Sequence, residues 1–98
     1  MERTGPGGVV ARVTLARPDA HNAFDASLIA ELRTTFAGLA REPAADLRAV
    51  ILAGDGPSFC AGADVAWMRA ALSLDVEGNE QDAMAMADAF ELIDTCPA

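Results

Sequence analysis

Residues 58–68, with the sequence SFCAGADVAWM, have the clearest chemical potential in the chain. A glycine flanked by small residues follows an apolar segment there and precedes the expected start of a helix, so main-chain N–H groups can be bared toward a ligand. Such N–H groups stabilise a carbonyl oxygen that gains negative charge in a transition state, and one well-placed donor is worth on the order of 3 kcal/mol. An ordinary glycine turn between a strand and a helix is the alternative that local sequence alone favours.

The other reactive side chains form no catalytic set that the sequence reveals. His21 is the sole histidine, and no Cys, His or carboxylate cluster stands at metal-ligand spacing, so we expect no metal site. Cys60 has no evident base beside it and is interpreted as a small buried hydrophobe, and two cysteines are too few for a disulfide framework. The glycines do not fit G-x-G-x-x-G, and a chain without lysine has no Walker A loop, which excludes Rossmann and P-loop sites.

The elements that must position this stretch alternate between strand and helix. Residues 9–15 are β-branched and partly alternating and predict a strand, and the apolar residues 49–53 predict a strand of the kind buried in parallel sheets. Between them, residues 25–40 predict a helix with Asp25 as its N-cap. Its apolar face is formed by Leu28, Ile29, Leu32, Phe36 and Leu39. Strand, helix and strand make a right-handed crossover unit, and the turn formers of residues 54–58 then carry the chain into an exposed loop.

Two further helices are expected in the last third of the chain. One begins near Trp67, and the other begins with Asn79 as a cap, has Asp82 in its first turn and ends before Pro97. The predicted class is α/β. Because two parallel strands leave an open sheet edge, we interpret residues 1–98 as a single partial domain.

Composition and charge exclude several classes of partner. The 98 residues are 52% hydrophobic with a formal net charge of -8, and residues 70–98 carry no basic side chain. An acidic chain without lysine or a basic stripe lacks the surface that binds nucleic acid. No apolar run approaches the roughly 20 residues needed to span a bilayer, and the first residues lack a signal-peptide pattern. We therefore expect a cytoplasmic protein with no nucleic-acid or membrane partner.

Two motifs resemble signatures of the crotonase superfamily, the enoyl-CoA hydratase/isomerase family. Residues 59–65, FCAGADV, are similar to its oxyanion-loop signature, and residues 17–24, RPDAHNAF, resemble its other N-terminal signature. They stand in the expected order, each at the end of a predicted strand. The resemblance extends from about Val9 to the last residue and implies the N-terminal portion of the crotonase-like spiral fold, which is built from β-β-α units.

The resemblance also implies the site. The N–H of Ala63 is the first of two oxyanion donors, and Trp67 and Met68 are candidates for the wall of the acyl pocket. Main-chain groups around three residues hold the adenine end of coenzyme A, and two further residues line the same channel. These five are Ala61, Asp64, Val65, Ala20 and His21.

One position departs from the family. A basic residue often stands near position 19 for the phosphates of coenzyme A, whereas this chain has Asp19, which leaves Arg17 as the nearest cation. Asp64 adjoins the oxyanion N–H but is expected to orient the loop through hydrogen bonds rather than to act as a base.

The activity that the resemblance implies is hydration of a 2-enoyl-CoA, in fatty-acid or branched-chain amino-acid metabolism. The coenzyme A thioester is then the substrate, and no cofactor is permanently bound. Residues 21–25 and 62–69 are similar to hydratases of branched enoyl-CoAs such as 3-methylglutaconyl-CoA. Isomerase and thioester hydrolase relatives share the oxyanion loop. Complete relatives form homotrimers that pair into hexamers, largely through C-terminal helices.

The resemblance places the second oxyanion glycine and the catalytic glutamates in a segment after these residues. A truncated chain that is not catalytic, with residual coenzyme A binding or a complementation role, is therefore the alternative. We predict that the 98-residue polypeptide alone has no hydratase activity above background.

Overall fold

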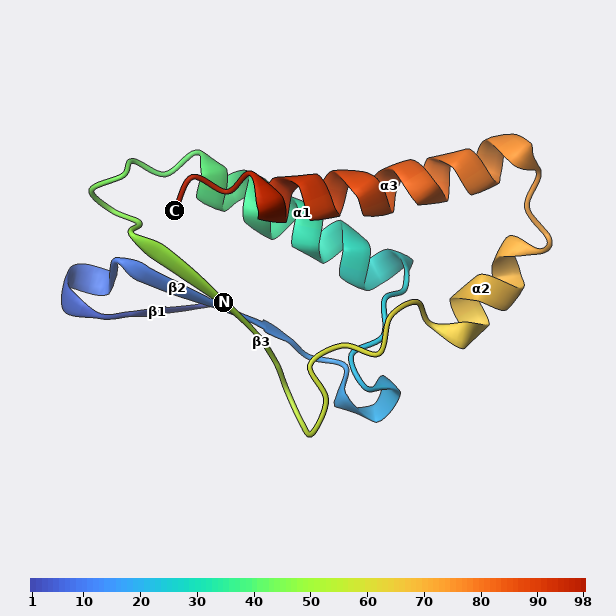
Figure 1. The fold of residues 1–98 in the computed structure, drawn as a ribbon, viewed down its shortest axis with the longest axis horizontal. Helices are drawn as coiled ribbons and strands as arrows, with labels where there is room; N and C mark the ends of the chain where they lie inside the picture. Colours follow the sequence, from blue (N-terminus) through green and yellow to red (C-terminus); the bar gives the residue numbers. More distant parts are fainter.

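A three-stranded sheet lies beside two long helices that pack against each other (Figure 1). The computed structural model describes all residues from 1 to 98. The strand order is β1 (Glu2–Thr4), β2 (Val10–Leu15), β3 (Ala49–Gly54), with β1 antiparallel to β2 and β2 parallel to β3. The predicted strands are confirmed, whereas β1 was not expected, because it is only three residues long and pairs through a turn rich in glycine and proline.

Helix α1 (Ala26–Ala40) connects the two parallel strands and supplies most of the core. Its expected cap is confirmed, since the carboxylate of Asp25 accepts a hydrogen bond from the N–H of Leu28 at 2.8 Å. The five residues predicted to form its apolar face are the residues of the helix that are buried. The face packs against the inward side chains of β2, which are Ala11, Val13 and Leu15.

Two helices follow β3, and both begin earlier than expected. Helix α2 (Val65–Ala71) is capped by Asp64, and helix α3 (Val76–Asp94) is capped by Asp75, whose carboxylate accepts from the N–H of Gly78 at 2.7 Å. The prediction of Asn79 as the α3 cap is wrong. The first turn of the helix contains Gly78, a poor helix former, so the sequence does not indicate a helix there. The turn forms because the Asp75 carboxylate accepts a hydrogen bond from a free N–H. No helix in the structure combines the length and hydropathy needed to cross a bilayer.

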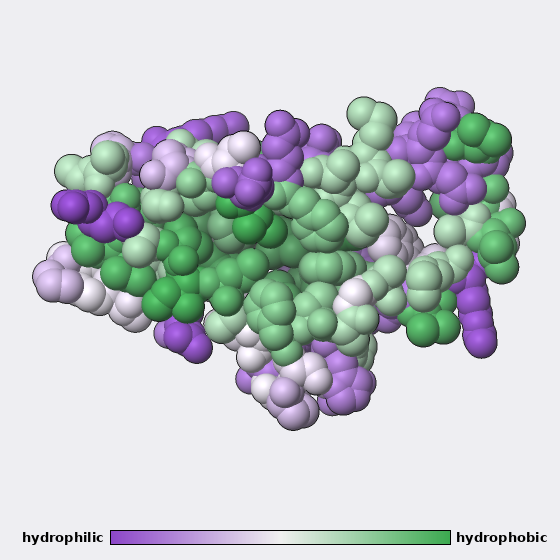
Figure 2. All heavy atoms as spheres, in the orientation of Figure 1, coloured by the Kyte–Doolittle hydropathy of each residue, from purple (hydrophilic) through white to green (hydrophobic).

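The core is thin and one side of β3 is uncovered. Only 12 of the 98 residues are buried, and Ile51 on the edge strand keeps 44% of its surface exposed. Figure 2 shows apolar side chains spread across the middle of one face, below the hydrophilic outer side of α3. The expected open edge is therefore present, and large apolar side chains such as Ile51, Phe59 and Phe90 remain exposed.

Candidate functional site

Two loops, one after β2 and one after β3, run side by side and form the framework of the site. The N–H of Ala61 donates to the carbonyl of His21 at 3.0 Å. The N–H of Phe24 donates to the carbonyl of Gly62, and the N–H of Asp64 donates to the carbonyl of Phe24, both at 2.7 Å. These bonds make Phe24 and Ala63 a single parallel β-bridge, so the two sequence motifs meet in space.

The main chain of Ala63 is left without a partner by this bridge. The ladder uses the carbonyl before Ala63 and the N–H after it, so the N–H and C=O of Ala63 itself face the other way. Neither group makes a hydrogen bond within the chain. A free N–H fixed by bonds on both sides is a preorganised donor for a ligand oxygen.

Two glycines allow the loop to take this path. Gly62 has φ +90°, a conformation that a side chain would strain. Gly54, at the end of β3, lies under the returning loop, and a Cβ added there would stand 2.5 Å from the carbonyl oxygen of Phe59. Cys60, interpreted from the sequence as a small buried hydrophobe, is half-buried and packs against the core. Its Sγ accepts a hydrogen bond from the N–H of Gly62 at 3.4 Å.

Asn22 joins the two loops and is fully buried. Its side-chain oxygen accepts from the N–H of Arg17 at 2.8 Å, and its side-chain nitrogen donates to the carbonyls of Asp55 and Ser58, both at 2.8 Å. The residue has φ 57°, a left-handed conformation that asparagine tolerates better than most residues. Sequence reasoning missed this role, because the partners are backbone groups that no side-chain motif marks.

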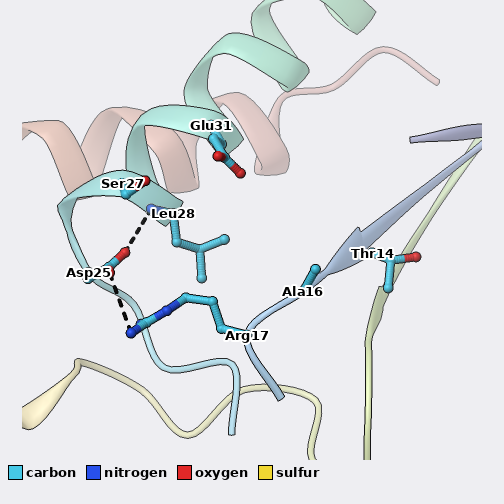
Figure 3. A pocket seen from close by; sticks show the side chains of 7 residues that line it. All are labelled: Thr14, Ala16, Arg17, Asp25, Ser27, Leu28 and Glu31. Atoms are coloured by element: carbon cyan, nitrogen blue, oxygen red, sulfur yellow. Dashed lines mark hydrogen bonds and ion pairs between the residues drawn. The ribbon is translucent and has the colours of Figure 1, made fainter. Parts of the chain in front are cut away.

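Arg17 links the site to the start of α1. Its guanidinium lies 3.4 Å from the carboxylate of Asp25 and 3.3 Å from that of Asp64, and it also donates to the carbonyl of Ala23. Figure 3 shows its side chain extending toward Asp25, the N-cap of α1, with Glu31 higher on the same helix, and all three residues line a cavity of about 270 Å³. Arg17, the cation nearest to position 19, is thus occupied by two carboxylates of the chain itself.

Asp64 caps α2 and holds the loop, as expected for a residue with a structural role. Its Oδ1 accepts from the N–H of Trp67 at 2.9 Å and its Oδ2 faces Arg17. The Trp67 N–H, with a further contribution from the Arg17 guanidinium, holds the pKa of Asp64 below its ordinary value of 3.8. The carboxylate is therefore ionised throughout the neutral range and is a poor proton acceptor there.

An apolar cavity of about 240 Å³ opens beside Ala63. Trp67, Met68 and Ala71 line it from the side of α2, and the other wall belongs to α3. The structure thus brings Ala63, Trp67 and Met68, three of the predicted site residues, to one cavity. Short apolar groups fit such a space next to a hydrogen-bond donor.

The residues predicted to hold coenzyme A lie close to one another on the two loops. His21 is exposed, and its Nδ1 lies 3.1 Å from the Oγ of Ser58, while Ala20 precedes it in a short turn. Both main-chain groups of Asp64 are already paired, with Phe24 and Met68. The carbonyl of Ala61 and the N–H of Val65 make no hydrogen bond in the chain and are the groups of this set that remain available to a ligand.

Comparison with known proteins decides the family. The sequence profile of the enoyl-CoA hydratase/isomerase family matches residues 6–97. The chain belongs to this family. The sequence-based expectation of crotonase-superfamily membership is confirmed.

Solved crotonase structures confirm the predicted fold class. Enoyl-CoA hydratases from Shewanella pealeana and Mycobacterium smegmatis match this crotonase-family chain with TM-scores of 0.86 and 0.85, at 35% and 34% sequence identity. The matches cover 97% and 98% of this chain but 35% and 36% of those proteins. The probable enoyl-CoA hydratase EchA14 of Mycobacterium tuberculosis is 31% identical over 87 residues, which are 89% of this chain and 32% of that protein. The chain thus spans about a third of the length of these relatives and corresponds to the N-terminal part of the fold.

Proposed function

We propose that the native protein binds an acyl-CoA and hydrates a 2-enoyl-CoA, with the N–H of Ala63 as one of two donors to the thioester oxygen. The observation that supports this most directly is the unpaired, rigidly held N–H beside an apolar cavity. When water adds across the double bond conjugated with the thioester, negative charge gathers on the carbonyl oxygen. A donor already in place stabilises that charge without reorganisation.

The described residues account for binding and charge stabilisation, and they leave proton transfer to other groups. Hydration needs a general base for the water and an acid for the carbon next to the thioester. We assign neither role to Asp64, because its carboxylate already faces the N–H of Trp67 and the guanidinium of Arg17. By family resemblance, catalytic glutamates and a second oxyanion donor lie in the segment that follows in longer relatives.

The loop pair is proposed to hold the nucleotide end of coenzyme A. The free carbonyl of Ala61 can accept from an adenine amino group, and the free N–H of Val65 can donate to a ring nitrogen or phosphate oxygen. Ala20, His21 and Asp64 would border the same channel. Because Arg17 is neutralised by two carboxylates, phosphate neutralisation is expected from elsewhere in the assembled protein, which we propose to be a homotrimer or a hexamer.

Finer assignments rest on motif similarity. Residues 21–25 and 62–69 are similar to hydratases of branched enoyl-CoAs, for which 3-methylglutaconyl-CoA is an example, and isomerase or thioester hydrolase chemistry would use the same oxyanion donor. A second candidate, a fragment that binds coenzyme A or complements another chain without catalysis, is favoured by the thin core and the uncovered β3.

Hydration of crotonyl-CoA, followed through loss of the absorbance of the conjugated thioester, tests the proposal. The native protein is expected to hydrate it without releasing free thiol, while the isolated 98-residue polypeptide is expected to stay at background. Failure of the native protein to hydrate any 2-enoyl-CoA overturns the proposed activity. Turnover by the isolated polypeptide would show that the described residues contain the acid and base.

A further inference from the structure

The cavity beside Ala63 has two chemically different walls. The side of α2 is apolar, with Trp67, Met68 and Ala71. The opposite wall is formed by four residues of α3, spaced i, i+3, i+4 and i+7, which share one stripe of the helix. They are Asn79, Asp82, Ala83 and Met86. In Figure 1, α2 and the first part of α3 lie at the same end of the molecule.

Asp82 places an uncompensated negative charge on this wall. The residue is half-buried, and its carboxylate makes no ion pair and no hydrogen bond within residues 1–98 and is in contact with solvent. The arginines that form ion pairs pair with other carboxylates, and no Lys or Arg occurs after Arg69. Arg69 itself is exposed and does not line the cavity.

We infer that Asp82 sets the acyl specificity of this site, so that the cavity accepts short, uncharged acyl chains and rejects acyl chains that end in a carboxylate. The inference rests on the proposed acyl-CoA function. A volume of about 240 Å³ is small for a ligand pocket, so a terminal carboxylate entering it lies close to Asp82. Near a protein surface two carboxylates repel each other more strongly than in bulk water, and no cation among residues 1–98 lines the cavity to offset this repulsion. The inference therefore narrows the branched substrates suggested by motif similarity to uncharged ones, and it excludes 3-methylglutaconyl-CoA, whose acyl chain ends in a carboxylate.

A matched pair of substrates tests this inference on the native protein. Glutaconyl-CoA differs from crotonyl-CoA by a carboxylate in place of one methyl hydrogen. The ratio of kcat/KM for glutaconyl-CoA to that for crotonyl-CoA is expected to be about tenfold or more below one. Asp82→Asn is expected to raise this ratio about tenfold, and Asp82→Arg is expected to raise it further. Thermal unfolding of both variants shows whether they fold.

The control is Glu80→Arg, which makes the same change of charge at an exposed α3 residue outside the cavity. This variant should leave the ratio at the wild-type value. A wild-type ratio near one, or equal shifts from Glu80→Arg and Asp82→Arg, overturns the inference.

A binding measurement separates failure of the inference from failure of the proposed activity. Butyryl-CoA and glutaryl-CoA form the corresponding saturated pair, and isothermal titration calorimetry measures the affinity of the native protein for each. If no enoyl-CoA is hydrated, the proposed hydration fails. The inference is still supported if the wild type binds butyryl-CoA more tightly than glutaryl-CoA and Asp82→Asn reduces this difference in affinity. Equal binding of the two thioesters overturns it.

Discussion

Arg17 and Asp64, 47 positions apart in the sequence, are joined by an ion pair of 3.3 Å that ties the first loop to the start of α2. The same guanidinium reaches Asp25, the cap of α1, at 3.4 Å. One side chain therefore sets the position of two helix starts relative to Ala63. We regard Arg17 as a positioning residue, because it holds the loop that carries the proposed donor.

Replacement of Arg17 is expected to loosen the site more than it weakens the fold. Arg17→Met removes two partly exposed ion pairs and a hydrogen bond to the Ala23 carbonyl, which should cost about 1–2 kcal/mol in the free energy of unfolding. Because the loop bearing Ala63 is released, kcat of the native protein should fall about tenfold or more.

The matched control is Arg33→Met, which breaks the exposed ion pair between α1 and Asp88 of α3, outside the two loops. It should change unfolding by no more than about 0.5 kcal/mol and leave kcat unchanged. Urea unfolding and steady-state kinetics measure both. Equal effects of the two variants on kcat would refute a positioning role for Arg17.

Removing the buried amide of Asn22 is expected to be costly for stability. Asn22→Ala leaves the N–H of Arg17 and the carbonyls of Asp55 and Ser58 without their partner, at a cost of about 3 kcal/mol. Asn79→Ala, at an exposed asparagine with one long hydrogen bond, should stay within about 0.5 kcal/mol. If urea unfolding shows that Asn22→Ala loses less than about 1 kcal/mol in the free energy of unfolding, the proposed role of Asn22 in joining the loops is contradicted.

A glycine substitution at the end of β3 and a control glycine substitution within α1 are expected to change stability in opposite directions. In Gly54→Ala the new Cβ meets the backbone of Phe59 at 2.5 Å, so the loop must shift, and a loss of about 2 kcal/mol is expected together with reduced turnover. Gly38 lies within α1 with nothing inside 4 Å of a new Cβ. Gly38→Ala should therefore gain about 0.5–1 kcal/mol. If Gly54→Ala is as stable as the wild type, the loop does not pack on β3 as described.

The lowered pKa of Asp64 predicts a specific pH dependence. Because this carboxyl is more acidic in the folded state than in the unfolded chain, its contribution is complete above the ordinary value of 3.8 and disappears as pH falls through the lowered value. Asp64→Asn keeps a good helix cap but loses the charge facing Arg17. The difference in unfolding free energy between wild type and variant should be constant from neutral pH to about pH 5 and should vanish at lower pH. A difference that persists unchanged at pH 2 would rule out this coupling.

Local sequence patterns predicted the helices and strands whose apolar residues recur at regular spacing. The α1 helix with its Asp25 cap and the strands Val10–Leu15 and Ala49–Gly54 follow from apolar spacing and turn residues. The placement of Ala63 beside Trp67 and Met68 was expected from family motifs rather than from periodicity. A cap four residues upstream of Asn79 was missed, because Gly78 weakens the helical pattern.

The contacts that position the site could not be read from local sequence. The bonds of Asn22 go to backbone carbonyls 33 and 36 positions away, and no side-chain pattern marks such partners. In the sequence Arg17 is the cation nearest to position 19, and no local pattern indicates that folding brings two carboxylates of the chain to it. Strand β1 also escaped prediction, because three residues carry too little periodicity.

The central claim is that the N–H of Ala63 stabilises charge on the thioester oxygen, and replacing that one N–H by an oxygen tests it most directly. Lactic acid incorporated in place of Ala63 converts the amide to an ester and preserves the side chain. The control is the same change at Ala61, whose N–H donates to the carbonyl of His21. This ester should lower the melting temperature and have a smaller effect on kcat than the ester at position 63. We predict that the ester at position 63 lowers kcat for crotonyl-CoA about 10²–10³-fold with little change in thermal unfolding. An unchanged kcat would contradict the account.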